Sequence, residues 1–164
     1  MTDRRSTPAV LFVCLGNICR SPLAEAALRA RLAEAAVEVA VDSAGTGSWH
    51  VGEPPDPRAQ AVALHNGHDI AHYRGRQVAA EDFYRFTHIY ALDHENLAEL
   101  QRRAPADATA RLALLLDLVE GLEGQPVADP YFGGEAGFHT TWSQVDRAAT
   151  ALVDYLQGME RLKG

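Results

Sequence analysis

The hydrophobic and polar positions of the chain divide it into short apolar runs and longer amphipathic segments. The clearest run, Ala9-Val10-Leu11-Phe12-Val13, is uninterrupted and therefore typical of a strand buried on both faces of a sheet. The predicted strands span residues 9–13, 38–42, 88–92 and 111–116. The last prediction has an alternative, because its leucine-rich run also suits a helix.

Helix signals fill the intervals between these strands. Ser21 is expected to be the N-cap of the first helix, with Pro22 in its first turn, and Asp56-Pro57 repeats this signature before the second. The predicted helices span residues 22–35, 56–64, 93–103 and 138–162. Because strands alternate with helices, the fold class is predicted to be α/β, with a parallel sheet covered on both faces.

Length and charge narrow the class of protein. A chain of 164 residues is expected to form one domain, and its formal net charge of -7 argues against a nucleic-acid surface. No apolar stretch has membrane-spanning length, so no membrane insertion is expected. Residues 1–8 lack the apolar middle of a signal peptide, and residues 1–7 are expected to be flexible. A cytoplasmic location is therefore expected, with secretion into a host left open.

The most informative motif is the segment from Cys14 to Arg20, directly after the first predicted strand. Gly16 lets the backbone approach a phosphate closely, and Asn17 tolerates the left-handed conformation that such a loop requires. Successive N–H groups, the following helix N-terminus and the Arg20 guanidinium would together bind a phosphate. The same positive field should hold Cys14 as a nucleophilic thiolate, to which Ser21 can donate a hydrogen bond.

A leaving alkoxide or phenoxide also needs a proton. Asp129 lies in a long loop over residues 120–137, which holds five glycines and two prolines, and Pro130 stiffens the segment that carries it. This carboxyl is predicted to act as general acid and then to activate water against a phosphocysteine. A simple turn at Asp129-Pro130 is the alternative.

No metal or cofactor is expected. His65, His68 and His72 have suggestive spacing, but no acidic or thiol ligand is clearly associated with them. The chain has only two cysteines, Cys14 and Cys19, and both lie in the phosphate-binding loop. That distribution argues against a disulfide framework and for a reducing compartment.

These motifs, with several others in the same order along nearly the whole chain, resemble the low-molecular-weight protein tyrosine phosphatases. The resemblance is carried by Val10–Glu25, Asp42–Thr46, Trp49–Gly52, Pro55–Ala59, Ala71-His72, Arg76–Val78, Asp93–Leu97 and Asp129–Tyr131. It implies a flavodoxin-like three-layer sandwich over residues 1–164, with a four-stranded parallel sheet in the order 2-1-3-4 and the site at the end of the first strand.

The resemblance also implies roles for individual residues. Cys14 is implied as nucleophile, Arg20 as phosphate ligand and Asp129 as general acid and base. The loop residues implied to bind phosphate beside Arg20 are Leu15, Gly16, Asn17, Ile18 and Cys19. The polar network implied to hold the loop comprises Asn17, Ser21, Ser43 and His72. Trp49 and Tyr131 are implied as walls for a phenyl ring.

Several of these roles have simpler alternatives. Cys19 is implied as partner of Cys14 in a reversible disulfide, but a packing thiol is the alternative. His72 is as readily a plain surface histidine. For Trp49 and Tyr131, the alternative is that they are ordinary partly buried aromatics. Phe132 stands where many relatives carry a second tyrosine, so a phosphorylation site is absent there.

Competing activities differ in what they need from this chain. A thioredoxin-linked arsenate reductase needs cysteines after Cys19, and the chain has none. A protein-arginine phosphatase typically has threonine at the position of Ile18, whose apolar side chain favours tyrosine. A phosphocysteine carrier would retain its phosphoryl group, whereas Arg20 with Asp129 argues for turnover. We therefore expect a monomeric, metal-independent phosphatase acting on phosphotyrosine proteins, with a bacterial tyrosine kinase as a candidate partner.

Overall fold

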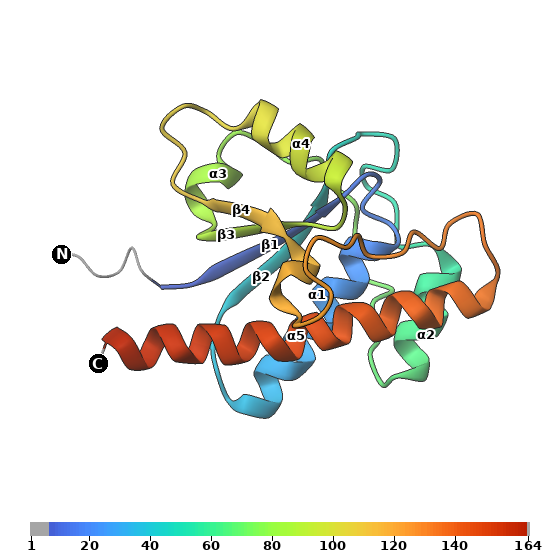
Figure 1. The fold of residues 1–164 in the computed structure, drawn as a ribbon. Helices are drawn as coiled ribbons and strands as arrows, with labels where there is room; N and C mark the ends of the chain where they lie inside the picture. Colours follow the sequence, from blue (N-terminus) through green and yellow to red (C-terminus); the bar gives the residue numbers. More distant parts are fainter. Residues whose placement is uncertain (1–6, 164) are drawn as a thin grey trace.

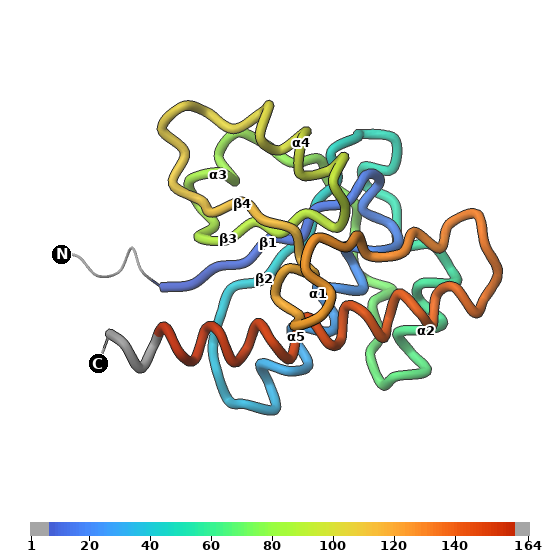
Figure 2. Tube along the Cα trace, viewed as in Figure 1, coloured from blue at the N-terminus to red at the C-terminus, as the bar shows by residue number. Residues whose placement is uncertain are grey.

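The computed structural model describes residues 7–163 and is built on a four-stranded parallel sheet (Figures 1 and 2). The strands are β1 (Ala9–Cys14), β2 (Ala40–Gly45), β3 (His88–Ala91) and β4 (Arg111–Leu114). Their order in the sheet is β2-β1-β3-β4, which confirms the predicted single-domain α/β fold with strand order 2-1-3-4. The flexible segment expected over residues 1–7 lies, apart from residue 7, outside the described residues.

Helices cover both faces of the sheet (Figure 1). The helices are α1 (Arg20–Ala35), α2 (Pro57–His65), α3 (Asp82–Arg85), α4 (His94–Arg103) and α5 (Glu135–Lys163). On one face α5 packs along α1 and also contacts α2, while on the other α4 packs against β3 and β4. A short 3-10 helix, η2 (Leu115–Leu118), follows β4 and contacts α5.

Alternating side chains of β1 supply both cores. Val10 and Phe12 belong to the core formed with α1 and α5, and Leu11 and Val13 belong to the core formed with α3 and α4. None of the four is more than 1% exposed. Burial of such a side chain stabilises the fold by about 1.5–3 kcal/mol, so β1 anchors both layers.

The carboxyl end of β1 is where a ligand site is expected in this topology. β1 pairs with β2 on one side and with β3 on the other. The connection after β1 leads to one edge of the sheet and the later connections lead to the other edge, so the strand order reverses beside β1. Open α/β sheets bind ligands beyond the carboxyl ends of the strands at such a switch point. Cys14 is the last residue of β1, so the sheet presents this thiol at the site.

Several predicted boundaries differ from the observed ones. The second strand was expected over residues 38–42 but runs from Ala40 to Gly45, because its polar end pairs with β1. The predicted fourth strand breaks after Leu114, where the chain turns into η2. The closing helix begins at Glu135, within the segment expected to be loop. The short helix α3 was not predicted.

The predicted N-cap of the first helix is also wrong. Cys19 takes that position without a side-chain cap, and α1 begins at Arg20. Ser21 lies inside the first turn and is fully buried, so its hydroxyl is used elsewhere. Across residues 7–163, no helix combines the length and the apolar character needed to cross a membrane.

Candidate active site

The segment after β1 closes into a tight loop around the Cys14 thiol. Asn17, midway between Cys14 and Arg20, has φ of 59°, a left-handed conformation that asparagine tolerates better than most residues. Its backbone N–H donates to Cys14 Sγ at 3.3 Å. The end of β2 supports the loop from behind, and a Cβ on Gly45 would lie only 2.7 Å from the carbonyl oxygen of Leu15. Glycine is therefore required at that contact.

A directional hydrogen-bond network ends on the sulfur. Ser21 Oγ lies 3.0 Å from Cys14 Sγ. Asn17 Nδ2 donates to Ser21 Oγ at 2.8 Å and to Ser43 Oγ at 3.1 Å, and Ser43 Oγ donates to Glu25 Oε1 at 2.8 Å. Because Ser21 Oγ already accepts from Asn17, its hydrogen is free to point at the sulfur, with only a 3.5 Å carbonyl contact competing. The network therefore favours stabilisation of a thiolate.

Two anchors hold this network in place. Glu25 is 5% exposed, and its second oxygen accepts from Arg29 Nε at 2.9 Å. Burial raises the pKa of Glu25, and the hydrogen bonds from Ser43 and Arg29 oppose that rise. On the other side, Asn17 Oδ1 accepts from the backbone N–H of Arg76 at 2.9 Å. Both ends of the Asn17 amide are thus fixed, which fixes the loop.

Arg20 is buried and held rigidly at the start of α1. Its Nη1 donates to Asp93 Oδ2 at 3.0 Å and to the carbonyl oxygen of Val127 at 3.1 Å. Asp93 follows β3, the neighbour of β1 in the sheet, so the sheet topology brings this carboxylate to the guanidinium. A guanidinium with one nitrogen fixed in this way is pre-organised to bind oxygens of a phosphate with its other donors.

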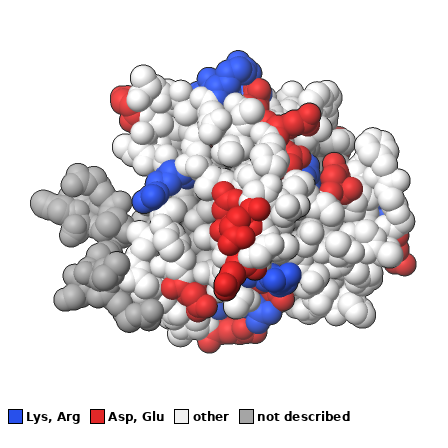
Figure 3. Space-filling view, viewed as in Figure 1, with Lys and Arg blue, Asp and Glu red and all other residues white. Residues whose placement is uncertain are grey.

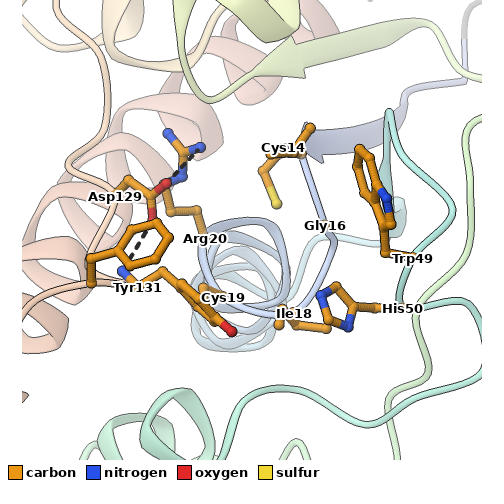
Figure 4. Close-up of a pocket in the computed structure, with 11 residues that line it drawn as sticks. Cys14, Gly16, Ile18, Cys19, Arg20, Trp49, His50, Asp129 and Tyr131 are labelled. Atoms are coloured by element: carbon orange, nitrogen blue, oxygen red, sulfur yellow. Dashed lines mark hydrogen bonds and ion pairs between the residues drawn. The ribbon is translucent and has the colours of Figure 1, made fainter.

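Asp129 lies over the same loop. Its Oδ2 is 3.7 Å from Arg20 Nη2, and its half-exposed carboxylate also accepts from the backbone N–H of Tyr131 at 3.1 Å. Asp129 therefore does form a local turn, and its carboxylate faces the arginine as well. Figure 4 shows Asp129 and Tyr131 on one side of the cavity, Trp49 on the opposite side and the sulfur of Cys14 between them.

The cavity that these residues enclose has apolar walls. Its volume is about 280 Å³. The apolar lining comes from Leu15, Ile18, Trp49, Tyr131 and Phe132. The indole of Trp49 lies over Gly47, where a Cβ would be 1.8 Å from the ring, so a larger residue at that position would displace the indole. Trp49 is 69% exposed and Phe132 is 93% exposed, which leaves the rim open to a flat aromatic group.

The two cysteines have different surroundings. Both are buried free thiols that line the cavity. Burial and the negative charge of Asp56 raise the pKa of Cys19 to about 12, so Cys19 remains a neutral thiol at physiological pH. Of the two, Cys14 is the one whose sulfur contacts the loop amide and the Ser21 hydroxyl.

The structure places His72 apart from the network to which the family resemblance assigned it. Its exposed ring packs edge-on against Tyr73, and within residues 7–163 it makes no hydrogen bond to Asn17, Ser21 or Ser43. His65 packs against His139 and His68 stacks on Trp142. No group of three histidine, cysteine or acidic side chains in the described part of the chain is placed to hold a metal ion.

Three residues of the site, Glu25, His50 and Asp93, belong to the sequence blocks that carry the family resemblance but were given no role from the sequence. Glu25 lies four residues after Ser21 and three before Leu28, spacings that place it on the buried face of α1. Asp93 follows directly on the third predicted strand, and its place at the carboxyl edge of the sheet could have identified it. His50, whose ring lies beside Gly16, also lines the cavity.

The fold and the thiol–arginine–carboxylate site define a phosphatase-like α/β enzyme, and comparisons with known proteins give the family. The family model described as "Low molecular weight phosphotyrosine protein phosphatase" matches residues 9–162. A protein of that name from Schizosaccharomyces pombe is 41% identical over 151 residues, which is 90% of this chain and 92% of the relative.

Solved structures agree with this assignment. A protein tyrosine phosphatase from Entamoeba histolytica superposes with a TM-score of 0.88 at 35% identity, covering 93% of this chain and 99% of that one. A structure described as a Drosophila arginine phosphatase superposes with a TM-score of 0.84 at 36% identity, covering 89% of this chain and 96% of that one.

The chain belongs to the low molecular weight phosphotyrosine protein phosphatase family. It is therefore an enzyme of the protein-tyrosine phosphatase class, a family of hydrolases whose substrates are phosphotyrosine proteins.

Proposed function

We propose that the enzyme hydrolyses protein phosphotyrosine through a covalent phosphocysteine formed on Cys14. The observation that carries the proposal is that Cys14, Arg20 and Asp129 line one cavity, with the sulfur 3.0 Å from a hydroxyl donor. Arg20 binds two phosphate oxygens, and backbone N–H groups of the loop bind the others. The loop residues are Leu15, Gly16, Asn17, Ile18 and Cys19.

In the first step the Cys14 thiolate attacks phosphorus. The S–P bond forms as the bond from phosphorus to the phenolic oxygen breaks, and protonated Asp129 gives its proton to the leaving phenoxide. In the second step ionised Asp129 takes a proton from water, whose oxygen attacks phosphorus and displaces the thiolate. Inorganic phosphate leaves, and Ser21 stabilises the departing thiolate by its hydrogen bond. No metal is needed in either step.

The apolar cavity supports a phenyl ring as the group that carries the phosphate. Trp49 and Tyr131 lie on opposite sides of the cavity, so a ring can pack between them as its phosphate reaches the loop (Figure 4). Ile18 adds an apolar wall without a hydrogen-bonding group, and a guanidinium would lose hydration there without compensation. Phosphotyrosine is therefore favoured over phosphoarginine.

Matched peptides test this proposal. The wild-type protein, reduced and with a chelator present, is expected to hydrolyse a phosphotyrosine peptide far faster than the same peptide with phosphoarginine. Cys14→Ser should abolish both activities. The reverse ranking would refute the assignment of substrate, and turnover by the serine variant would refute the assigned nucleophile.

Three further features belong to the proposal. All the proposed catalytic residues come from one chain, so a monomer suffices. An opposing protein-tyrosine kinase must supply the substrate. Cys19 lines the same cavity as Cys14, which supports a protective role: a peroxide would oxidise Cys14 to the sulfenic acid, and the Cys19 thiol would then displace water to form a reversible disulfide.

A further inference from the structure

A second groove adjoins the active-site cavity. Its volume is about 560 Å³, and it shares the side chains of Leu15, Arg20, Trp49 and Asp129 with that cavity. From these shared walls it extends over the first turns of α4, where Glu95 and other residues line it. A substrate bound at Cys14 would therefore have neighbouring residues within reach of the groove.

The groove carries an excess of negative charge. The carboxylates that line it are Asp93, Glu95, Glu99 and Asp129, and the cations are Arg20 and Arg103. Ion pairs neutralise most of this set: Asp93 and Asp129 pair with Arg20, and Glu99 pairs with Arg102 and Arg103. Glu95 is exposed and has no ion-pair partner within residues 7–163. In Figure 3, acidic side chains lie over α4, with basic ones towards one end of the helix.

A buried amide also lacks a partner at this groove. Asn96 lines it and is only 3% exposed, yet its Oδ1 has no hydrogen-bond partner in the described part of the chain. Buried side-chain oxygens normally accept at least one hydrogen bond. The carboxylate of Glu95, which also lines the groove, is a second acceptor, and the complementary ligand for such a groove is a cation that only donates, such as a guanidinium or an ammonium.

We propose that this groove binds an arginine or lysine side chain of the protein substrate, close in sequence to the phosphotyrosine. The inference rests on the proposed function, because phosphotyrosine in the catalytic cavity brings the flanking residue to the groove. Arg20 lines both the catalytic cavity and the groove. When a phosphate binds to Arg20, the positive charge of Arg20 no longer offsets the groove carboxylates, so the groove attracts a cation more strongly. Glu95 is the specificity-determining residue.

Phosphotyrosine peptides that differ at one flanking position test the inference. Alanine, arginine, lysine or glutamate is placed in turn at each of the nearest positions on both sides, and kcat/KM is measured for wild type, Glu95→Gln and Glu95→Lys. Because Glu95 is exposed, both variants should fold. For wild type, a basic residue at the matching position should raise kcat/KM about threefold over alanine, the scale of an exposed ion pair.

The variants and a control separate local binding from the overall charge of the protein. Glu95→Gln should remove most of the preference, Glu95→Lys should reverse it in favour of glutamate, and high salt should weaken it. Glu120→Gln, the same change at an exposed glutamate outside the groove, should keep it. Hydrolysis of p-nitrophenyl phosphate should be unchanged in Glu120→Gln, and for each variant the preference is taken as kcat/KM relative to the alanine peptide of the same variant, which removes any general effect of the altered charge.

Two results would overturn the inference. Turnover of every peptide without a preference for basic residues, or a preference that survives Glu95→Lys, would overturn this inference and leave the proposed function standing. Failure to hydrolyse any phosphotyrosine peptide, the alanine peptide included, would overturn the proposed function and the inference with it.

Discussion

Replacement of Ser43 with alanine should destabilise the protein by an amount that grows with pH. Ser43 Oγ donates to Glu25 Oε1 at 2.8 Å and accepts from Asn17 Nδ2 at 3.1 Å, and all three residues are buried. The alanine variant loses both hydrogen bonds and leaves one oxygen of Glu25 without its donor. The cost therefore depends on whether Glu25 is ionised.

The magnitude follows from the two bonds. A hydrogen bond between neutral groups contributes about 0.5–1.5 kcal/mol, and one to a charged group contributes about 1.5–3 kcal/mol. With Glu25 ionised, the loss of both bonds should cost about 2–4.5 kcal/mol. With Glu25 protonated, both bonds are neutral and the cost falls to about 1–3 kcal/mol. The stability gap should therefore widen by about 1–1.5 kcal/mol on ionisation.

The direction of the pH dependence is set by burial. Burial raises the pKa of Glu25 in the folded protein above its ordinary value of 4.5, and the bond from Ser43 opposes the rise. When a carboxyl has a higher pKa in the folded state than in the unfolded state, it stabilises the fold at pH values below the unfolded-state pKa. This stabilisation is lost as the pH rises through the folded-state pKa. Without Ser43 the folded-state pKa of Glu25 rises further, so the gap between variant and wild type should open above pH 4.5.

Urea unfolding across this pH range measures the gap directly. Wild type and Ser43→Ala are compared with Glu25→Gln and the double variant, in which position 25 cannot ionise. The gap caused by Ser43→Ala should widen with pH in the wild-type background and stay constant in the Glu25→Gln background. A pH-independent gap in both backgrounds would refute the assigned charge state of the network.

Two further predictions concern Asp93 and His88. Asp93→Asn keeps an oxygen to cap α4 but loses the negative charge that holds Arg20 at 3.0 Å. The value of kcat/KM for p-nitrophenyl phosphate should therefore fall about tenfold, and an unchanged value would contradict the role assigned to Asp93. Burial, with a smaller effect from Arg111, lowers the pKa of His88 in the folded protein below 6.5. On acidification the unfolded state therefore binds a proton at a higher pH than the folded state, and stability should fall as the pH drops below 6.5. Urea unfolding should show this fall in wild type and a smaller one in His88→Phe; equal falls would contradict it.

The pattern of apolar runs was sufficient for the sheet because β1 is buried on both faces and reads as a continuous hydrophobic segment. The polar end of β2 carried no such signal. In that strand, Ser43 hydrogen-bonds Asn17 and Gly45 leaves room for the loop backbone. Serine and glycine are present there for the site, although neither residue favours a strand. The boundary of β2 was therefore displaced in the prediction.

The loop chemistry was accessible from local sequence, whereas the residues that support it come from distant segments. Cys14 and Arg20 lie six positions apart, and one stretch of sequence carries both. Asp93 reaches Arg20 only because β3 lies beside β1. Glu25 lies in an alanine-rich helix where an acidic residue suggests a solvated face, yet its carboxylate is buried.

Detection of a phosphocysteine tests the central claim most directly. The wild-type enzyme is mixed with p-nitrophenyl phosphate at mildly acidic pH and quenched in denaturant during turnover, and phosphorus NMR is used to look for a thiophosphate resonance. We predict that resonance in wild type and a greatly reduced turnover rate in Asp129→Ala, with neither turnover nor adduct in Cys14→Ser. Undiminished turnover by Cys14→Ser would contradict the account.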